Sequence, residues 1–379
     1  MKPQHFLAGL GLPALAIAAA LAAPPAPSPA PAQANLNNIK LPAGFRIAYY
    51  AQNVGGAREL ALGPDGTVYV GSKEQGKVYA LPDRNRDGKA DEVITLASGL
   101  NNPNGVAVRA GSLYVAEINR ILRYDNIAAK LKNPPKPVVV YNKLPDDEWH
   151  GWRYIAFGPD GLLYVPVGAP CNSCLPKKPI YGTINRLKPD GSGFENFAKG
   201  VRNTVGFDWH PVTKEMWFTD NGRDQMGDDL PADELNRAPR AGLHFGFPHF
   251  FAGDVPDPDF SKGKSAASYQ KPARKLGAHV AGLGMKFYTG KQFPAKYRNQ
   301  ILIPEHGSWN RSSKSGYRIS LVKLDPTGKQ ALSYEPFAEG WLVGQQSWGR
   351  PVALLVLPDG SLLVSDDQGD AVFRIWYAG

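Results

Sequence analysis

A hairpin of two apolar strands joined by a tight turn recurs along this chain and constrains its fold more than any other feature. In the clearest copies the turn contains Pro-Asp-Gly, and the flanking runs are rich in Val, Tyr and Leu. In the weaker copies only the two apolar runs and a turn persist. The clear copies span Leu60–Val70, Ile155–Val167 and Leu354–Ser365, and the weaker ones span Val106–Ala116, Phe207–Thr219 and Gly284–Pro304.

The turn residues have distinct roles. Pro sets φ at the first corner, Asp caps the turn backbone, and Gly accepts a positive φ. Because such a hairpin cannot bury its faces alone, the copies must stack on one another. Six copies over residues 35–379 give about 57 residues each, near the longer propeller repeats, whereas a β-sandwich needs no such repeat. The sequence therefore predicts an all-β, six-bladed β-propeller, with Phe45–Ala51 joining the last blade to close the ring.

The N-terminal region has a different composition. Lys2 precedes an apolar run over residues 6–22, and a Pro/Ala-rich stretch ends at an A-x-A site whose last residue is Ala34. This pattern predicts a signal peptide and Pro-rich spacer over 1–34, followed by a single catalytic propeller domain over 35–379. The alternative is an uncleaved membrane anchor, for which the apolar run is short. No later segment is suited to cross a bilayer, so we expect a periplasmic or secreted protein without a stable membrane span.

The chain is basic, with a formal net charge of +9. An exported chain without a basic helix or zinc-finger spacing is not expected to bind nucleic acid. Two interpretations of the charge stay open. It could serve solubility and long-range steering, or it could attract an anionic cofactor or an acidic partner.

The chain has two cysteines, Cys171 and Cys174, in a C-x-x-C spacing. Covalent haem attachment would need a His directly after the second Cys, where Leu175 stands. A zinc site would need further soft ligands nearby, and a catalytic redox pair would need a thioredoxin-like βαβ context. We therefore favour a local disulfide in an exported protein, and we expect the chain to hold no haem.

Unusual polar clusters occur in loops next to the hairpins. One contains His150 between two tryptophans, directly before an expected strand. An isolated His in a turn is most often structural, but a His with an ordinary pKa near 6.5 also suits proton abstraction at neutral pH. Single arginines on a surface mostly form ion pairs, whereas several at one mouth of a ring suit planar carboxylates. The clusters span residues 147–153, 200–204, 219–224 with 233–236, and 305–311 with 347–350.

Together, these motifs resemble the soluble quinoprotein sugar dehydrogenases. The similarity lies in the His150 loop with its following turn, in Gly200-Val201-Arg202-Asn203, in Asp220-Asn221-Gly222, in Asp233-Glu234-Leu235-Asn236 and in Gly242-Leu243-His244-Phe245-Gly246. Their order is kept from about Leu41 to Gly379. This is the glucose/sorbosone dehydrogenase family, which binds pyrroloquinoline quinone (PQQ) and folds as a six-bladed propeller. The chain is most similar to its L-sorbosone or pyranose dehydrogenase branch.

The resemblance implies roles for individual residues. His150 occupies the position of the catalytic base, and Gly222 and Arg223 match two residues whose backbone carbonyls hold a Ca²⁺ ion under PQQ. The glucose enzymes have a Lys in the 305–311 region and an Asp directly before the His, so the neighbours here argue against glucose as the substrate. The residues implied in cofactor binding are Arg202, Asn203, Asn221, Trp309, Arg311 and Arg350.

The implied chemistry suits these residue types. PQQ is a flat tricarboxylate, which calls for Arg forks and an aromatic floor, and Ca²⁺ takes oxygen ligands and polarises the quinone. His150 would remove the hydroxyl proton of a sugar, such as sorbosone or another aldose or pyranose, while hydride passes to the quinone. The electrons must then leave to an external acceptor, a cytochrome or a quinone.

A separate segment has calcium-loop spacing. Asp83, Asn85, Asp87 and Asp91 occupy positions 1, 3, 5 and 9, with Gly at position 6. Position 12 lacks the expected Glu, so a structural Ca²⁺ site and a plain Asp/Asn/Gly-rich turn both stay open.

Two other function classes remain. A calcium-dependent propeller lactonase would need carboxylates and Asn converging on one central metal, and the Arg-rich loops disfavour it. An exported propeller that binds carbohydrate or protein without catalysis would fit the altered neighbours of His150, among them Trp149.

Overall fold

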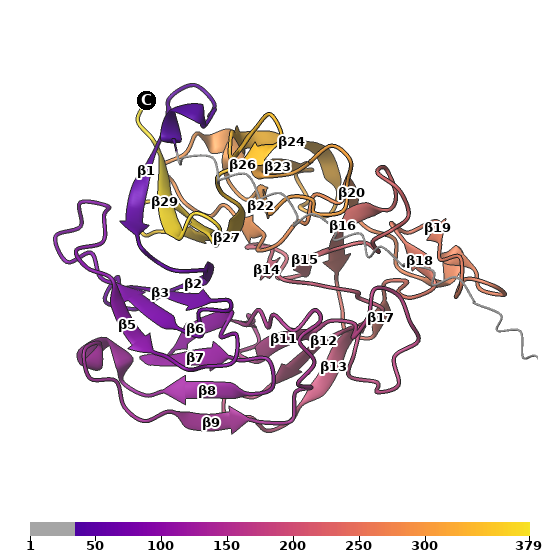
Figure 1. Ribbon diagram of the computed structural model, residues 1–379, viewed down its shortest axis with the longest axis horizontal. Coiled ribbons are helices and arrows are strands. Elements are labelled where there is room, and N and C mark those ends of the chain that lie inside the picture. Colours follow the sequence, from indigo (N-terminus) through magenta and orange to yellow (C-terminus); the bar gives the residue numbers. More distant parts are fainter. Residues whose placement is uncertain (1–34) are drawn as a thin grey trace, which may run out of the picture. The chain divides into compact units, whose positions relative to one another are not determined.

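The computed structural model describes residues 35–379, and the predicted signal peptide and spacer over 1–34 lie outside the described residues. Within residues 35–379 the chain is almost entirely β, and six sheets form the blades of a β-propeller (Figure 1). Four short 3-10 helices occur in this range, at Leu36–Asn38, Ile127–Lys130, Ala266–Ser268 and Ala295–Tyr297. None of the helices in this range is long and apolar enough to span a membrane.

The first three blades follow the chain order. Blade 1 consists of β2 (Ala57–Leu62), β3 (Val68–Ser72), β4 (Val78–Leu81) and β5 (Ile94–Ala97). Blade 2 consists of β6 (Gly105–Arg109), β7 (Ser112–Ala116), β8 (Ile121–Tyr124) and β9 (Val138–Tyr141). Blade 3 consists of β10 (Ala156–Phe157), β11 (Leu163–Val167), β12 (Thr183–Leu187) and β13 (Glu195–Lys199), with β17 (Leu243–His244) added in parallel to β13.

The last three blades complete the ring. Blade 4 consists of β14 (Phe207–Trp209), β15 (Met216–Asp220), β16 (Ala232–Ala238) and β20 (Arg274–Ala278). Blade 5 consists of β21 (Lys286–Phe287), β22 (Ile301–Glu305), β23 (Arg318–Leu324) and β24 (Ala331–Glu339). Blade 6 consists of β27 (Pro351–Val356), β28 (Leu362–Asp366), β29 (Ala371–Tyr377) and β1 (Phe45–Gln52). Two small hairpins, β18 (Phe250–Phe251) with β19 (Val255–Pro256) and β25 (Leu342–Val343) with β26 (Gln346–Ser347), lie outside the blades.

The predicted hairpins are confirmed as the first two strands of each blade, for example in the pairing of Leu60 with Val70 in blade 1. The turn chemistry also holds, since Gly66 has a φ of +91° and the Asp65 carboxylate accepts the N–H of Thr67 at 3.2 Å. The ring closes as predicted, because β1 pairs antiparallel with β29, where Phe45 faces Tyr377. In Figure 1 the indigo β1 lies beside the yellow β29.

The blades are joined by contacts between their first strands. The first strands of neighbouring blades contact one another, as β2 does with β6 and β27, so these strands surround the axis. Since the first two strands of a blade run antiparallel, every first strand begins, and every second strand ends, at the same end of the ring. The residues at these strand ends therefore meet around one mouth.

Glu59 connects three blades through its side chain. Its buried carboxylate, through Oε2, accepts the N–H of Val106 in blade 2 at 3.0 Å and the N–H of Ile155 beside blade 3 at 3.1 Å.

We expect Glu59→Ala to lower the free energy of unfolding by about 2–4 kcal/mol, since two buried donors lose their acceptor. Thermal melting would measure the loss. The matched change Glu195→Ala removes an exposed carboxylate that pairs with Arg186 and should cost less than about 1 kcal/mol. Equal effects of the two changes would contradict this role of Glu59.

Candidate active site

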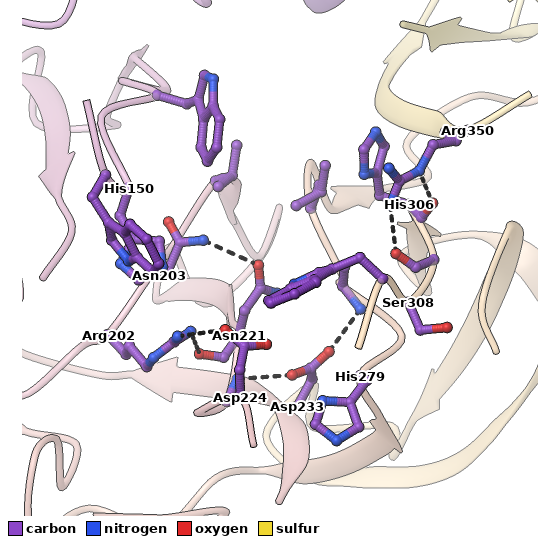
Figure 2. A pocket seen from close by; sticks show the side chains of 18 of the residues that line it. His150, Arg202, Asn203, Asn221, Asp224, Asp233, His279, His306, Ser308 and Arg350 are labelled. Carbon is purple, nitrogen blue, oxygen red and sulfur yellow. Dashed lines mark hydrogen bonds and ion pairs between the residues drawn. The ribbon is translucent and has the colours of Figure 1, made fainter. Parts of the chain in front are cut away.

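A cavity of about 520 Å³ opens where the first strands begin and the second strands end. Its wall is built from loops of all parts of the ring, and Figure 2 shows the polar side chains from opposite walls directed toward it. Seven of the residues singled out from the sequence line this cavity: His150, Arg202, Asn203, Asn221, Gly222, Trp309 and Arg350. The tertiary structure thus brings together loops that lie up to 200 positions apart in the chain.

His150 precedes β10 and adopts a left-handed backbone conformation with a φ of +52°. Its ring is buried, and Nδ1 lies 2.8 Å from the carbonyl oxygen of Ala169. A carbonyl only accepts, so Nδ1 carries the proton and Nε2 carries the lone pair. Arg153 holds the loop in place by donating to the carbonyls of His150, Ile118 and Pro145 at 2.9–3.2 Å.

The environment of His150 favours the neutral ring. Burial lowers the pKa of His150 well below its ordinary value, and the nearby guanidinium of Arg202 lowers it further. The hydrogen bond to Ala169 works in the opposite direction but is the smaller effect. A neutral imidazole with a lone pair on Nε2 can accept a proton from a ligand hydroxyl.

Arg202, Asn203 and Asn221 form the wall next to His150 (Figure 2). The Arg202 guanidinium donates to the backbone carbonyls of Asn172 at 2.7 Å and Asn221 at 3.2 Å, and it pairs with Asp224 at 3.1 Å. The amide of Asn203 donates to the side-chain oxygen of Asn221 at 3.3 Å. Most donors of Arg202 are therefore used to hold the wall together, while its charge still faces the cavity.

Two buried carboxylates fix these loops from behind. Asp220, at the end of β15, accepts the N–H groups of Arg202 and Asn203 at 2.9 and 2.6 Å. Asp233, in β16, accepts the N–H of Gly222 at 2.7 Å and the N–H of Ala281, which lies between β20 and β21, at 2.7 Å. Burial raises the pKa of Asp220 to about 7 and that of Asp233 to about 6. The loops that face the cavity are thus set by buried hydrogen bonds rather than by solvent-exposed contacts.

Arg350 and His306 lie on the wall of the cavity opposite His150 and Arg202 (Figure 2). Arg350 donates through Nε to the carbonyl of His306 at 2.9 Å and through Nη2 to the carbonyl of Gly307 at 2.6 Å. His306 lies with Nε2 2.8 Å from a carboxylate oxygen of Asp367, and burial lowers its pKa to about 4 despite that carboxylate. His306 is therefore neutral at pH 7 and donates its Nε2–H to Asp367.

Two cations of the cavity wall were missed from the sequence. Arg58 is buried and pairs with Asp367 at 3.0 Å, and its guanidinium carbon lies 5.9 Å from the ring centre of Trp152. Lys73, directly after β3, places its ammonium 5.6 Å from the same ring. Trp152 packs against Val205, and both side chains line the cavity, where Trp152 supplies an aromatic face.

The position of Arg58 within its copy of the hairpin repeat could have identified it from the sequence. Aligning the turns on their proline places Arg58, Val205 and Val352 each six residues before that proline. Val205 and Val352 belong to the apolar cluster that also contains Trp152. An alignment of the copies would therefore have assigned Arg58 to the axis of the ring, although no local motif surrounds it.

Arg311 is not brought to the cavity. Its guanidinium binds the backbone carbonyl of Asp228 and pairs with Asp229 at 3.2 Å, so it stabilises an outer loop. Trp309 lines the cavity at its rim, with 69% of its surface exposed. Arg223 directs its side chain to Asp257 at 2.6 Å, away from the cavity lining, and the role of its carbonyl stays a prediction.

The segment Asp83–Asp91 lies after β4, on the outside of blade 1. Its oxygens accept backbone N–H groups of the same segment, as Asp83 does from Asp87 at 3.2 Å and from Gly88 at 3.0 Å. Across residues 35–379, no group of three or more His, Cys, Asp or Glu side chains is arranged to hold a metal ion. Calcium binding by Asp83, Asn85, Asp87 and Asp91 stays a prediction.

The chemistry that the cavity can support follows from its lining. The cavity presents the Trp152 ring and more cations than carboxylates: the cations are Arg58, Lys73, Arg202 and Arg350, and the carboxylates are Glu148, Asp224 and Asp233. Such a set suits a planar, multiply anionic ligand, because guanidinium groups bind carboxylates in a planar geometry. His150 stands at the edge of this space with the lone pair on Nε2.

The cysteine prediction is also confirmed. Cys171 and Cys174 form a disulfide, and their loop lies against Arg202. Residues 35–379 contain no free cysteine.

Known proteins bear on this fold in three ways. Residues 31–368 match a family described as a domain of unknown function (DUF7133). An uncharacterized protein of Borreliella burgdorferi is 33% identical over 356 residues, which cover 90% of this chain and 91% of that protein. Among solved structures, the iodide structure of a Trichoderma reesei protein of Carbohydrate-Active Enzymes Family AA12 is similar, with a TM-score of 0.76, 18% identity, and coverage of 89% of this chain and 97% of that chain. The holo form of the pyranose dehydrogenase PQQ domain from Coprinopsis cinerea has a TM-score of 0.75 and 19% identity, over 93% of this chain and 99% of that chain.

Proposed function

The chain belongs to the family of the domain of unknown function DUF7133, and on that premise we propose that it is a PQQ-dependent dehydrogenase of sugars. One observation supports this most. A buried His150, with its lone pair on Nε2, stands beside a cavity lined by four cationic side chains at the mouth of a propeller. The propeller of Coprinopsis cinerea that shares this fold is a pyranose dehydrogenase domain named for PQQ.

The residues present fit PQQ. The cofactor is a flat tricarboxylate, and the cavity offers Arg58, Lys73 and Arg350 as cations together with the Trp152 ring. Arg202, whose donors are mostly occupied, contributes its charge rather than a free fork. For Ca²⁺, the backbone carbonyls of Gly222 and Arg223 are the proposed ligands, since hard cations take oxygen donors.

The residues of this chain have separable tasks in the proposed reaction. When bound, PQQ supplies a two-electron quinone oxidant, and Ca²⁺ supplies a Lewis acid beside it. His150 accepts the hydroxyl proton of the sugar at Nε2, while Ala169 fixes the ring through Nδ1. Asn203 and Asn221 orient the reactants from the adjacent wall. The exposed Trp309 and Trp149 at the rim offer faces for a sugar ring.

We further propose a sorbosone-type or other aldose or pyranose substrate, an external cytochrome or quinone as the electron acceptor, and export to the periplasm or the medium. The substrate proposal rests on the neighbours of His150, which differ from those of the glucose enzymes. Export rests on the N-terminal pattern.

The test uses purified protein freed of cofactor. Calorimetry with PQQ, with and without Ca²⁺, measures binding, and dye reduction across a panel of sugars measures turnover. We expect saturable PQQ binding and sugar-dependent dye reduction. Lack of PQQ binding would overturn the proposal, and lactone hydrolysis without PQQ would favour the lactonase alternative. Carbohydrate binding without turnover at saturating PQQ would favour the non-catalytic alternative.

The pH profile of the PQQ-loaded enzyme gives a prediction of its own. A general base acts in its deprotonated form, and the pKa of His150 is lowered well below 6.5 by burial and by Arg202. The deprotonated form therefore persists to lower pH than for an ordinary His. We expect the acid limb of kcat/KM to lie below pH 6.5, measured with dye reduction at saturating PQQ. A limb at or above pH 6.5 would contradict the environment described for this ring.

A further inference from the structure

The segment over residues 168–174 follows β11 and contacts the His150 loop directly. The carbonyl of Ala169 accepts from Nδ1 of His150 at 2.8 Å. Gly168 allows this approach, because a Cβ there would lie 2.6 Å from Cβ of His150 and 2.9 Å from its carbonyl oxygen. Any larger residue at position 168 would push the two loops apart.

The same segment holds Arg202 by main chain and side chain. The N–H of Ala169 donates to the carbonyl of Arg202 at 2.8 Å. Asn172 accepts from the Arg202 guanidinium twice, at its backbone carbonyl from Nε at 2.7 Å and at its side-chain oxygen from Nη2 at 2.9 Å. Arg202 is almost fully buried, so these acceptors replace water around its charge.

Asn172 also reaches a third loop. Its side-chain oxygen accepts the N–H of Asp224 at 2.9 Å, and its side-chain amide donates to the carbonyl of Asp224 at 3.1 Å. The hydroxyl of Ser173 donates to Asp257 at 2.6 Å, and Asp257 pairs with Arg223. One short segment therefore contacts the loops that contain His150, Arg202 and Asp224.

No strand or helix holds residues 168–174 in this position. Instead, the Cys171–Cys174 disulfide closes the segment around Asn172 and Ser173. Cys171 packs against the buried cluster of Ala169, Phe247 and Phe251, which attaches this small ring to the propeller. The cross-link restricts the backbone conformations that would otherwise separate Asn172 from Arg202.

We propose that the disulfide-closed segment 168–174 is the positioning element of the site, in which Ala169 joins His150 to the backbone of Arg202 and Asn172 holds the Arg202 guanidinium in place. This rests on the proposed function for the identity of the ligand, but the positioning itself is a property of the protein without cofactor. Asn172 acts through Arg202 and is a positioning residue, not a catalytic one.

The first measurement needs no cofactor. The ring resonance of His150, assigned with a His150→Asn variant, is titrated by NMR in the wild type, in Asn172→Ala and in Cys171→Ser/Cys174→Ser. The charged groups that face His150 are Arg202, from the neighbouring loop, and Arg153, on its own loop. If the segment loosens, water reaches the ring and Arg202 moves away, so the pKa of His150 should rise toward 6.5. An unmoved titration in both variants, with both still folded by thermal melting, overturns the proposal.

The second measurement is PQQ affinity by calorimetry. Asn172→Ala should weaken binding about tenfold or more, as for a lost hydrogen bond to a charged group. Asn172→Asp keeps the oxygen that accepts from Arg202 but loses the amide that donates to the carbonyl of Asp224, so its affinity should lie between those of the wild type and Asn172→Ala. The control Asn133→Ala changes an exposed Asn that does not line the cavity and should leave both readouts unchanged. If wild-type protein does not bind PQQ, the proposed function fails, while the titration still decides the role of the segment. Equal loss of affinity in Asn172→Asp and Asn172→Ala would contradict the role of the acceptor oxygen.

Discussion

His150→Ala is expected to reduce sugar-dependent dye reduction by about 10²–10⁴-fold, the range for loss of a general base. PQQ affinity should stay within a few-fold of the wild type, because Arg58, Lys73 and Arg350 lie elsewhere on the cavity wall. The physical reason is that His150 presents the lone pair of Nε2 beside the cavity from a buried ring whose orientation is fixed through Nδ1. Single-turnover dye reduction at saturating PQQ, alongside calorimetry, measures the two quantities separately.

The matched control is His249→Ala. His249 lies outside the cavity, and its Nδ1 is 2.8 Å from the carbonyl of Phe260, which resembles the contact of His150 with Ala169. This variant should retain activity close to that of the wild type. If His150→Ala lost PQQ binding in proportion to activity, with unchanged turnover per bound cofactor, the ring would be structural.

Arg350→Met is expected to weaken PQQ binding by about 2–5 kcal/mol, or roughly 30- to 4,000-fold. Arg350 uses Nε and Nη2 to bind the carbonyls of His306 and Gly307, so its Nη1 group is the part that a ligand carboxylate would meet. Loss of the guanidinium would leave that carboxylate without its counter-charge in a partly buried site. Calorimetric titration with PQQ measures the change.

Two comparisons sharpen this second test. Arg350→Lys keeps the charge without the planar fork, so its affinity should lie between those of wild type and Arg350→Met. Arg240→Met removes an exposed guanidinium from a turn outside the cavity and should leave affinity unchanged. Affinity of Arg350→Met within threefold of wild type would remove Arg350 from the proposed cofactor site.

The placement of Arg311 and Arg350 shows why site predictions from sequence succeed unevenly. Both residues are arginines in polar loops, Arg311 after the first hairpin of blade 5 and Arg350 before that of blade 6. Arg350 directly precedes the first strand of its blade, and such positions point to the mouth of the ring. Arg311 lies in a longer loop after β22, and that loop turns outward to bind Asp228 and Asp229. Because this loop is long, the sequence does not fix the direction in which the Arg311 side chain points. Contacts with the neighbouring loops decide that direction.

The sequence by itself determined the hairpin repeat, the turns, the closing strand and the local disulfide. Each depends on residues close together in the chain, such as the Asp65 carboxylate that caps the N–H of Thr67 within its own turn. Strand alternation and turn chemistry act over a few positions, so they are visible without the fold.

Only the tertiary structure decided which side chains share the cavity. Arg58 and Asp367 pair at 3.0 Å although they are 309 positions apart, and this contact exists because β1 closes the ring on β29. Likewise, Asn172 meets Arg202 only because blades 3 and 4 stack side by side. Contacts between loops of different blades depend on how those blades pack, and no local pattern records that geometry. His150 could thus be named from the sequence as a candidate base, whereas the carbonyl of Ala169 that orients its ring could not.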